Sequence, residues 1–306
     1  MVSDSPLFRA QYPFKSHFFQ LNGLNYHYLD EGQGEVLLLL HGNPSWSFYY
    51  RHLVRDLRND YRLIVPDHIG CGLSDKPADS QYSYTLKQRV DDLEALLEHL
   101  SLNTRMTLVL HDWGGMIGMA WAMRHPERVA RLVLLNTAAF HLPQDKKLPL
   151  ALKICRDTQF GAFLVQGLNL FARGAAWVGC KRKRMSAELR DLYCSPYDNW
   201  QHRVATLRFV QDIPLTEEDP GFALVSQVEA GLSQFADRPI CICWGEKDFV
   251  FDRQFLARWQ KIYPAAEVNS FADCGHYILE DARDEVILII RQFLNDHPLE
   301  KEFHDA

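Results

Sequence analysis

Apolar residues recur along the chain in two patterns that predict strands. Residues 17–21 and 25–29 alternate between apolar and polar side chains around Asn22-Gly23, a dipeptide that favours a tight hairpin turn. Short continuous apolar runs are instead typical of strands buried on both faces of a sheet. Buried strands of this kind are predicted over residues 36–40, 63–65, 106–110, 132–135 and 240–244, with a last strand over 268–271.

Segments with the spacing of amphipathic helices alternate with these strands. Residues 84–100 carry apolar side chains three and four positions apart, and Thr85 with Gln88 forms a capping box at their start. Further helices are predicted over 114–124, 253–262 and 281–294. Because parallel strands need crossover connections, this alternation predicts an α/β fold with a mostly parallel, eight-stranded sheet.

One long segment breaks the alternation. Residues 140–215 contain no convincing strand pattern and are predicted as amphipathic helices over 149–157, 160–177, 186–193 and 200–211. We interpret residues 140–215 as a helical cap inserted after the sixth strand. The core domain then consists of residues 1–139 and 216–306, and we refer to 140–215 as the cap segment.

Composition narrows the classes of function. The formal net charge is −6 and the isoelectric point is near 6.1, whereas proteins that bind nucleic acid usually carry a basic face. No run reaches the roughly 18 apolar residues of a membrane helix, and residues 1–19 lack the apolar core of a signal peptide. The seven cysteines show no disulfide or zinc spacing, so we expect reduced thiols in a cytoplasmic protein. The basic run 181–184 is interpreted as a solvated tip; contact with an acidic partner or membrane surface is the alternative.

The candidate chemistry centres on Asp112. It lies in His111-Asp112-Trp113-Gly114-Gly115, where a buried strand runs directly into a helix. A sharp strand-to-helix turn exposes such a side chain at the carboxyl edge of the sheet, and the helix N-terminus stabilises an anion there. An ionised aspartate can attack a saturated carbon and form an alkyl ester. The alternative is that Asp112 only caps the helix.

Two further residues complete a triad in sequence order. His276 follows the last predicted strand, and Asp248 follows the strand before it. Nucleophile, acid and histidine in this order are typical of the α/β-hydrolase fold. Because Asp112 is already ionised, His276 is expected to act as base on the water that hydrolyses the ester, with Asp248 orienting it. Glu246 is a nearby rival for the acid, whereas Asn136 is an amide and cannot replace Asp248.

Asn43 and Trp113 are candidates for binding the leaving group. Their backbone N–H groups can form an oxyanion hole, and their side chains add an amide and an indole N–H donor. The alternatives are local turn bonding for Asn43 and core packing for Trp113. No metal or organic cofactor is implied, and the expected pocket is apolar, lined by residues of 140–215.

Four motifs resemble the haloalkane dehalogenase family of α/β-hydrolases across nearly the whole chain. They are HGNPSWSFYYR at 41–51, PDHIGCGLSDKP at 66–77, HDWGG at 111–115 and FVQDIPL at 209–215. The resemblance implies an Asp112 nucleophile, a His276 base, an Asp248 acid and an Asn43–Trp113 halide site. The stretches LNTAAF at 135–140 and GLNLFARGAA at 167–176 are most similar to the third subfamily, which includes β-lactone decarboxylases of bacterial olefin biosynthesis.

The expected function is therefore cleavage of a carbon–halogen or carbon–oxygen bond in an apolar alkyl substrate through a covalent aspartyl ester. Formation of cis-olefins by β-lactone decarboxylation is the alternative, and the resemblance then also implies assembly with other enzymes of a hydrocarbon pathway. An epoxide hydrolase would use two cap tyrosines, for which Tyr193 and Tyr197 are available. A fluoroacetate dehalogenase would carry Arg in place of Trp113. A non-catalytic receptor would not need the filled catalytic positions.

Overall fold

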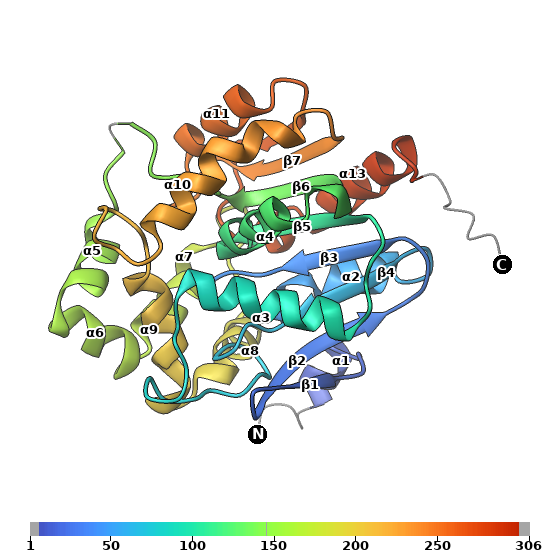
Figure 1. Cartoon of the computed structure of the whole chain (residues 1–306). Coiled ribbons are helices and arrows are strands. Elements are labelled where there is room, and N and C mark those ends of the chain that lie inside the picture. The colour runs from blue at the N-terminus through green and yellow to red at the C-terminus, as the bar shows by residue number, and fades with distance from the viewer. Residues whose placement is uncertain (1–5, 145, 300–306) are drawn as a thin grey trace.

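The computed structural model describes residues 6–144 and 146–299. One eight-stranded sheet runs through the described chain in the order β1-β2-β4-β3-β5-β6-β7-β8 (Figure 1). β1 and β2 are antiparallel, β2 is antiparallel to β4, and the remaining neighbours are parallel. The strands are β1 (His17–Leu21), β2 (Leu24–Glu31), β3 (Val36–Leu40), β4 (Arg62–Pro66), β5 (Met106–Asp112), β6 (Val129–Thr137), β7 (Ile240–Gly245) and β8 (Glu267–Phe271).

The helices of the core domain cover both faces of this sheet. Leu93, Ile117 and Phe255 pack in one apolar cluster, and Leu53 and Ile290 pack in a second cluster on the opposite face. These helices are α1 (Pro6–Gln11), α2 (Arg51–Leu57), α3 (Leu86–His99), α4 (Trp113–Arg124), α10 (Phe222–Gly231), α11 (Arg253–Ile262), α12 (Ile278–Asp281) and α13 (Arg283–Asp296). Single 3-10 turns occupy Ser47–Tyr50, Pro126–Arg128, Ser195–Tyr197, Gln201–Arg203 and Leu232–Phe235.

The central strands of the sheet are buried because their residues are mostly apolar. Every residue of β3, β5, β6 and β7 is buried, as the continuous apolar runs predicted. The Asn22-Gly23 hairpin also forms, with both residues at positive φ. The α/β fold and its mostly parallel sheet are therefore confirmed, and the carboxyl ends of β3, β5, β6 and β7 meet at one edge.

The cap segment is helical between β6 and β7, but one predicted helix is wrong. Residues 160–177 form two helices, because Asn169 adopts φ 55° and donates its amide N–H to the carbonyl oxygen of Tyr197. An α-helix cannot continue through a left-handed residue. The helices of this segment are α5 (Leu150–Asp157), α6 (Gln159–Gln166), α7 (Leu170–Val178), α8 (Ala187–Cys194) and α9 (Val204–Gln211).

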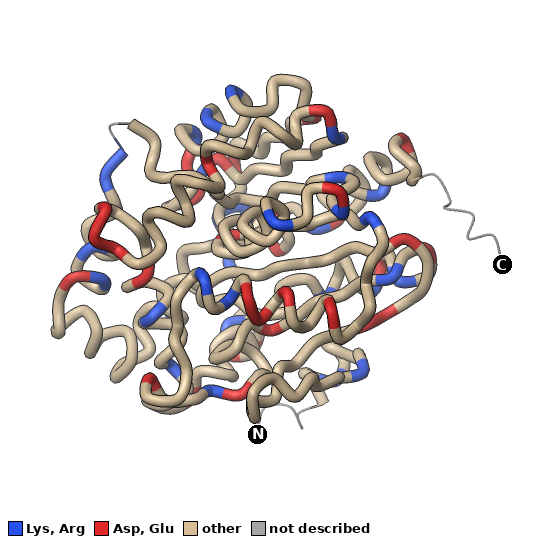
Figure 2. Tube along the Cα trace, viewed as in Figure 1, with Lys and Arg blue, Asp and Glu red and all other residues tan. Residues whose placement is uncertain are grey.

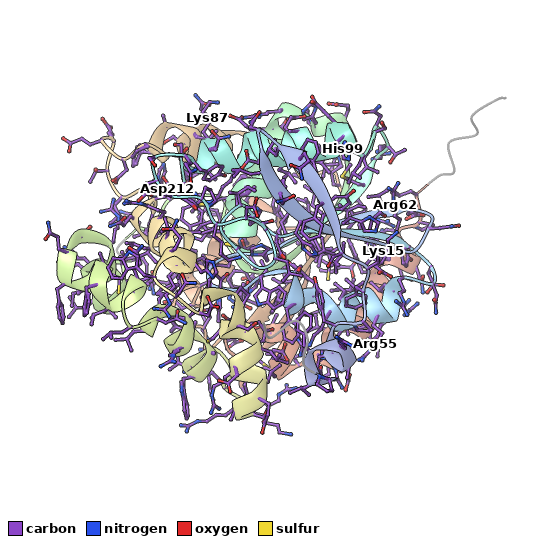
Figure 3. All side chains as sticks on the ribbon, turned by 90° about the horizontal axis from the view of Figure 1, so that it is seen from below. Lys15, Arg55, Arg62, Lys87, His99 and Asp212 are labelled. Atoms are coloured by element: carbon purple, nitrogen blue, oxygen red, sulfur yellow. The ribbon has the colours of Figure 1, made fainter. Side chains whose placement is uncertain are left out.

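Helix α3 shows how the amphipathic pattern positions an element. Leu86, Val90 and Leu93 are buried in the core, whereas Lys87 projects outward and pairs with Asp91 (Figure 3). The Thr85 hydroxyl accepts a hydrogen bond from the N–H of Gln88 at 3.3 Å, so the predicted helix start is confirmed. The Gln88 side chain instead donates to Asp92, so only the Thr85 half of the predicted capping box is made.

We predict that Thr85→Ala will lower the free energy of unfolding by about 1 kcal/mol, because an N–H of the first turn loses its acceptor. Urea denaturation measures this change. Thr85→Ser keeps the hydroxyl and is expected to stay close to the original stability. Equal unfolding midpoints for the Ala and Ser variants would show that the hydrogen bond of the Thr85 hydroxyl does not stabilise the protein.

Candidate active site

Asp112 stands at the turn between β5 and α4. Its backbone has φ 52° and ψ −125°, a conformation that L-residues rarely adopt. The neighbouring strand end leaves room for it only because residue 42 is glycine: a Cβ there would lie 1.9 Å from Asp112 Oδ1. Gly114 lets α4 approach β3, since a Cβ would lie 2.0 Å from the carbonyl oxygen of Leu40. The predicted strand-to-helix turn is thus present.

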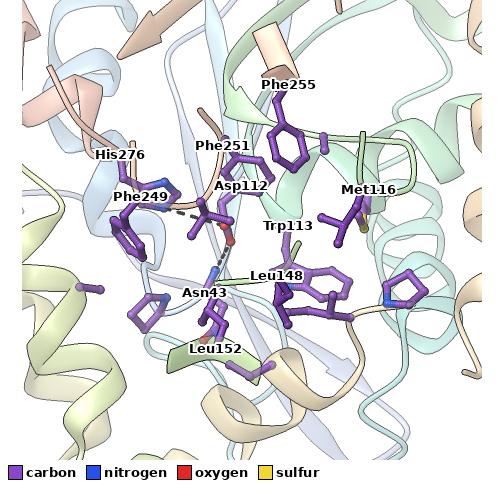
Figure 4. A pocket seen from close by; sticks show the side chains of 18 of the residues that line it. Asn43, Asp112, Trp113, Met116, Leu148, Leu152, Phe249, Phe251, Phe255 and His276 are labelled. Atoms are coloured by element: carbon purple, nitrogen blue, oxygen red, sulfur yellow. Dashed lines mark hydrogen bonds and ion pairs between the residues drawn. The ribbon is translucent and has the colours of Figure 1, made fainter. Parts of the chain in front are cut away.

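Backbone donors hold the Asp112 carboxylate. The N–H of Asn43 donates to Asp112 Oδ1 at 2.6 Å, and the N–H of Trp113 also bonds the carboxylate. His276 Nε2 lies 3.8 Å from the other oxygen, Oδ2 (Figure 4). Burial raises the pKa of Asp112, while the charge of His276 and these N–H groups act to lower it. One carboxylate oxygen is fixed and the other faces the histidine.

His276 is oriented by Asp248. Its Nδ1 donates to Asp248 Oδ2 at 2.8 Å, because a carboxylate can only accept. In the neutral ring this leaves Nε2, which faces Asp112, as the acceptor. Burial lowers the pKa of His276, but the charge and hydrogen bond of Asp248 together with the charge of Asp112 outweigh it, and the net pKa is raised. The structure therefore brings Asp112, His276 and Asp248 together in the geometry of a triad.

Asn136 supports the acid, a contact that sequence reasoning missed. Its Nδ2 donates to Asp248 Oδ2 and to the carbonyl oxygen of Gly245, both at 3.0 Å, and its Oδ1 accepts from the N–H of Gly245. Asp248 Oδ1 accepts a further bond from the N–H of Val250. The sequence held a signal for this contact. Asn136 lies at the end of the predicted strand that comes before the strand preceding Asp248, so the two residues are expected at the same edge of the sheet. Asn136 thus fixes the carboxylate that it cannot replace.

The side chains of Asn43 and Trp113 both contact α9 of the cap segment. Asn43 Nδ2 donates to the carbonyl oxygen of Thr206 at 3.0 Å, and the Trp113 ring lies 5.3 Å from the ring of Phe209. One of the two Asn43 amide hydrogens is therefore bound to protein, a detail the sequence did not indicate. The other hydrogen and the Trp113 indole N–H have no partner within the described residues.

An apolar pocket of about 830 Å³, part of it open to solvent, lies above the carboxylate (Figure 4). Asn43, Asp112, Trp113 and His276 contribute to its wall. The rest is almost entirely aliphatic and aromatic, and comes from both the core and the cap segment. These lining residues are Met116, Ala138, Phe140, Leu142, Leu148, Leu152, Phe171, Ala175, Val210, Ile213, Pro214, Phe249, Val250, Phe251 and Phe255, with Pro44 and His141.

The rival residues lie elsewhere. Glu246 pairs with Arg253 and accepts a bond from Ser270, while Asp248 holds His276. Tyr193 donates to Glu280 and Tyr197 to the carbonyl oxygen of Ser45, and neither is among the pocket residues above. Nor does any Arg or Lys belong to this pocket lining. Within the described chain, no group of three or more His, Cys, Asp or Glu side chains is arranged to hold a metal.

Comparisons with known proteins agree with this fold. The family model described as alpha/beta hydrolase fold matches residues 35–282, so the chain belongs to the α/β-hydrolase fold family and is an enzyme of the haloalkane dehalogenase-like group within it. A solved structure of the haloalkane dehalogenase DatA from Agrobacterium tumefaciens superimposes with a TM-score of 0.82 at 24% identity, over 92% of this chain and 96% of that chain.

Sequence relatives define the group more closely. A cis-3-alkyl-4-alkyloxetan-2-one decarboxylase of Shewanella oneidensis is 58% identical over 93% of this chain and 89% of its own. The protein of the same name from Xanthomonas campestris is 49% identical, over 90% of this chain and 94% of its own. Haloalkane dehalogenase 2 of Mycobacterium tuberculosis is 30% identical, over 91% and 94%.

We predict that Asp248→Asn will lower the pKa of His276 below its value in the unmodified protein. The carboxylate that favours the charged imidazole is then gone, while burial, which favours the neutral ring, remains. NMR titration of the imidazole measures the shift. Glu246→Gln is the matched control and should leave the His276 pKa unchanged. A pKa that falls in Glu246→Gln and stays the same in Asp248→Asn would identify Glu246 as the carboxylate that pairs with His276.

Proposed function

We propose that this enzyme opens a β-lactone with two apolar alkyl substituents by forming an ester on Asp112, and then releases carbon dioxide and an alkene. The observation that carries the proposal is the ionisable carboxylate of Asp112 at the base of an apolar pocket, oriented for attack by backbone donors. The names of the two relatives with 58% and 49% identity support an oxetan-2-one, a β-lactone ring, as the substrate.

In this proposal each site residue has one role. Asp112 is the nucleophile. His276, oriented by the acid Asp248, is the base where water must hydrolyse the ester. Asn43 and Trp113, both in the pocket wall, bind the negative charge that develops on the leaving group through the second amide hydrogen of Asn43 and the indole N–H of Trp113. The positions of these side chains support the assignment: His276 Nε2 is 3.8 Å from Asp112 Oδ2, the oxygen not bonded by Asn43.

The first step forms one bond and breaks another. Asp112 Oδ2 attacks the ring carbon that bears both an alkyl group and the ring oxygen. The carbon–oxygen bond breaks, the configuration at that carbon inverts, and the ring oxygen becomes part of a free carboxylate. The new carboxylate carries one negative charge, which the Asn43 and Trp113 donors stabilise.

The second step needs no water. The electrons of the carbon–carbon bond to the carboxylate form the double bond, carbon dioxide leaves, and the Asp112 carboxylate is regenerated. Inversion followed by anti elimination gives the same relative geometry as direct syn loss, so a cis-lactone yields a cis-alkene. Atoms and charge balance without a cofactor.

Haloalkane hydrolysis is the second candidate, because the Asn43–Trp113 pair offers two neutral donors to a departing halide. The Asp112 ester then has no carboxylate to lose. His276 would instead take a proton from a water that attacks the ester carbonyl, with the N–H groups of Asn43 and Trp113 stabilising the oxyanion. The same five residues thus serve both reactions, and the substrate decides the fate of the ester.

The proposal also includes the expectations for the cap segment, the cellular location and the partners. Residues 140–215 act as a cap over the pocket, supported by Leu152, Phe171 and Val210 in its wall. The site of action is the cytoplasm, supported by seven free cysteines. Association with other enzymes of a hydrocarbon pathway stays a proposal. No described helix is long and apolar enough to cross a membrane.

Incubation with a cis-3,4-dialkyl oxetan-2-one is expected to give a cis-alkene and carbon dioxide, detected by gas chromatography. Asp112→Ala removes the nucleophile and should abolish alkene formation. Glu246→Gln is a control expected to keep full activity. Absence of alkene with the unmodified protein, together with bromide release from 1-bromoalkanes, would instead establish the haloalkane reaction.

His276→Ala is expected to trap the ester formed from a bromoalkane, because the water that hydrolyses it is no longer activated. Mass spectrometry should show the alkyl adduct on the peptide containing Asp112. In ¹⁸O-water, a single turnover of a haloalkane by the unmodified protein should label Asp112 and leave the alcohol unlabelled. Label found directly in the alcohol would mean that water attacks the substrate itself.

A further inference from the structure

The outer surface of the cap segment is unusually apolar. Eleven large hydrophobic side chains are exposed among the described residues, and eight of them lie within 140–215. Phe160 is 67% exposed and Trp177 is 51% exposed, and Phe163, Leu170 and Trp200 belong to the same group. Scattered apolar residues on a surface are ordinary, but their concentration on one segment marks an interaction site.

Two helices of this segment are apolar on both sides. Helix α7 presents Phe171 and Ala175 to the pocket, while Leu170 and Trp177 face outward. Helix α6 contains no charged residue and is drawn entirely tan in Figure 2. A surface helix normally has a polar outer face, and a helix that is apolar all round is normally covered on all sides.

The cap segment also differs from the rest of the chain in net charge. The cap segment contains twelve Lys and Arg residues against six Asp and Glu residues, a net charge of +6, so the rest of the chain carries −12. Four of these twelve, Lys146, Arg156, Arg182 and Arg208, pair with carboxylates outside 140–215, so the excess of positive charge on the surface of the segment is smaller than the count. A basic surface with exposed Trp, Phe and Leu is the composition of elements that lie in the interface of an anionic membrane.

Arginines and aromatic rings are interleaved on this surface. Arg190 lies over the Trp177 ring at 3.9 Å, and a polar groove beside them also contains Arg173, Arg203 and two carboxylates, Asp191 and Asp198. Arg203 is fully engaged by backbone carbonyls, whereas Arg173 is exposed and no side-chain partner is described for it. Arg173 is therefore available to an external anion.

The basic run 181–184 contributes less than its sequence indicates. Arg182 pairs with Asp273 and Glu285, and the backbone N–H groups of Lys181 and Arg182 donate to Asp281. This run is exposed, as expected, but anchored to the core domain. The interaction surface is accordingly assigned to α6, α7 and Trp200, which we call the outer cap face.

We propose that the outer cap face docks on an anionic lipid surface. Charge argues against a second copy of the chain, because two-fold pairing of this face would bring two Arg173 side chains into one interface, and α6 and α7 contain no carboxylate to pair with them. The proposal does not depend on which bond Asp112 cleaves. Docked in this way, α7 would separate the lipid from the pocket by the thickness of one helix.

Vesicle flotation tests the proposal with purified full-length protein. Binding is expected to mixed phosphatidylcholine–phosphatidylglycerol vesicles and not to phosphatidylcholine alone. It should weaken as salt rises, since the screening length falls from about 10 Å at 0.1 M to about 3 Å at 1 M. Phe160→Ser combined with Trp177→Ser should weaken binding at least about tenfold, because two apolar anchors are lost.

Matched controls separate docking from folding. Leu288→Ser changes a side chain that is also 67% exposed but lies on α13, and it should bind vesicles like the unmodified protein. Arg173→Glu reverses a charge without removing apolar packing and should weaken binding to anionic vesicles only. Thermal unfolding verifies that each variant is folded.

Three outcomes would overturn the proposal. The first is no flotation of the unmodified protein with anionic vesicles. The second is equal flotation of the unmodified protein and the double variant. The third is light scattering that shows a dimer which the double variant dissociates, since the outer cap face would then be covered by a second copy.

Discussion

The site depends on one backbone constraint, the conformation of Asp112 between β5 and α4. At φ 52° and ψ −125° the residue can neither continue the strand nor begin the helix, so its side chain rises from the edge of the sheet. Glycine at position 42 leaves the space that the carboxylate occupies, and the N–H groups of Asn43 and Trp113 hold it there. The strain of this turn is sustained by the buried strands on either side, β3 and β6, which fix the path of β5.

Much of this arrangement could be predicted from the sequence, because it depends on local pattern and on order along the chain. The apolar runs located the buried strands, and the positions of Asp112, Asp248 and His276 at the ends of β5, β7 and β8 located the triad. Contacts between distant segments could not be predicted in the same way. The Asn136 bonds to Asp248 and Gly245 depend on the register of β6 and β7, and the break at Asn169 depends on a carbonyl of Tyr197 that lies 28 residues further on.

A single nucleophile can support two reactions because the ester is only an intermediate. The protein supplies a fixed carboxylate, two donors and an oriented histidine, and none of these groups distinguishes a halide from a lactone oxygen. An ester that contains a carboxylate from the opened lactone can lose carbon dioxide and release the alkene without water. A simple alkyl ester has no such group and must be hydrolysed by water. In the proposed mechanism His276 and Asp248 are therefore most important for the second kind of substrate, while Asp112 is required for both.

The hydrogen bond from Asn43 to Thr206 joins the core loop after β3 to helix α9 of the cap segment. Any displacement of α9 that admits substrate or releases product must break this bond and move Phe209 away from Trp113. If Asn43 and Trp113 bind the leaving anion as proposed, the position of α9 and the affinity for that anion are linked, and linkage is reciprocal. Binding of the anion would then shift any equilibrium between open and closed positions of α9 by the same factor as closure shifts the affinity for the anion.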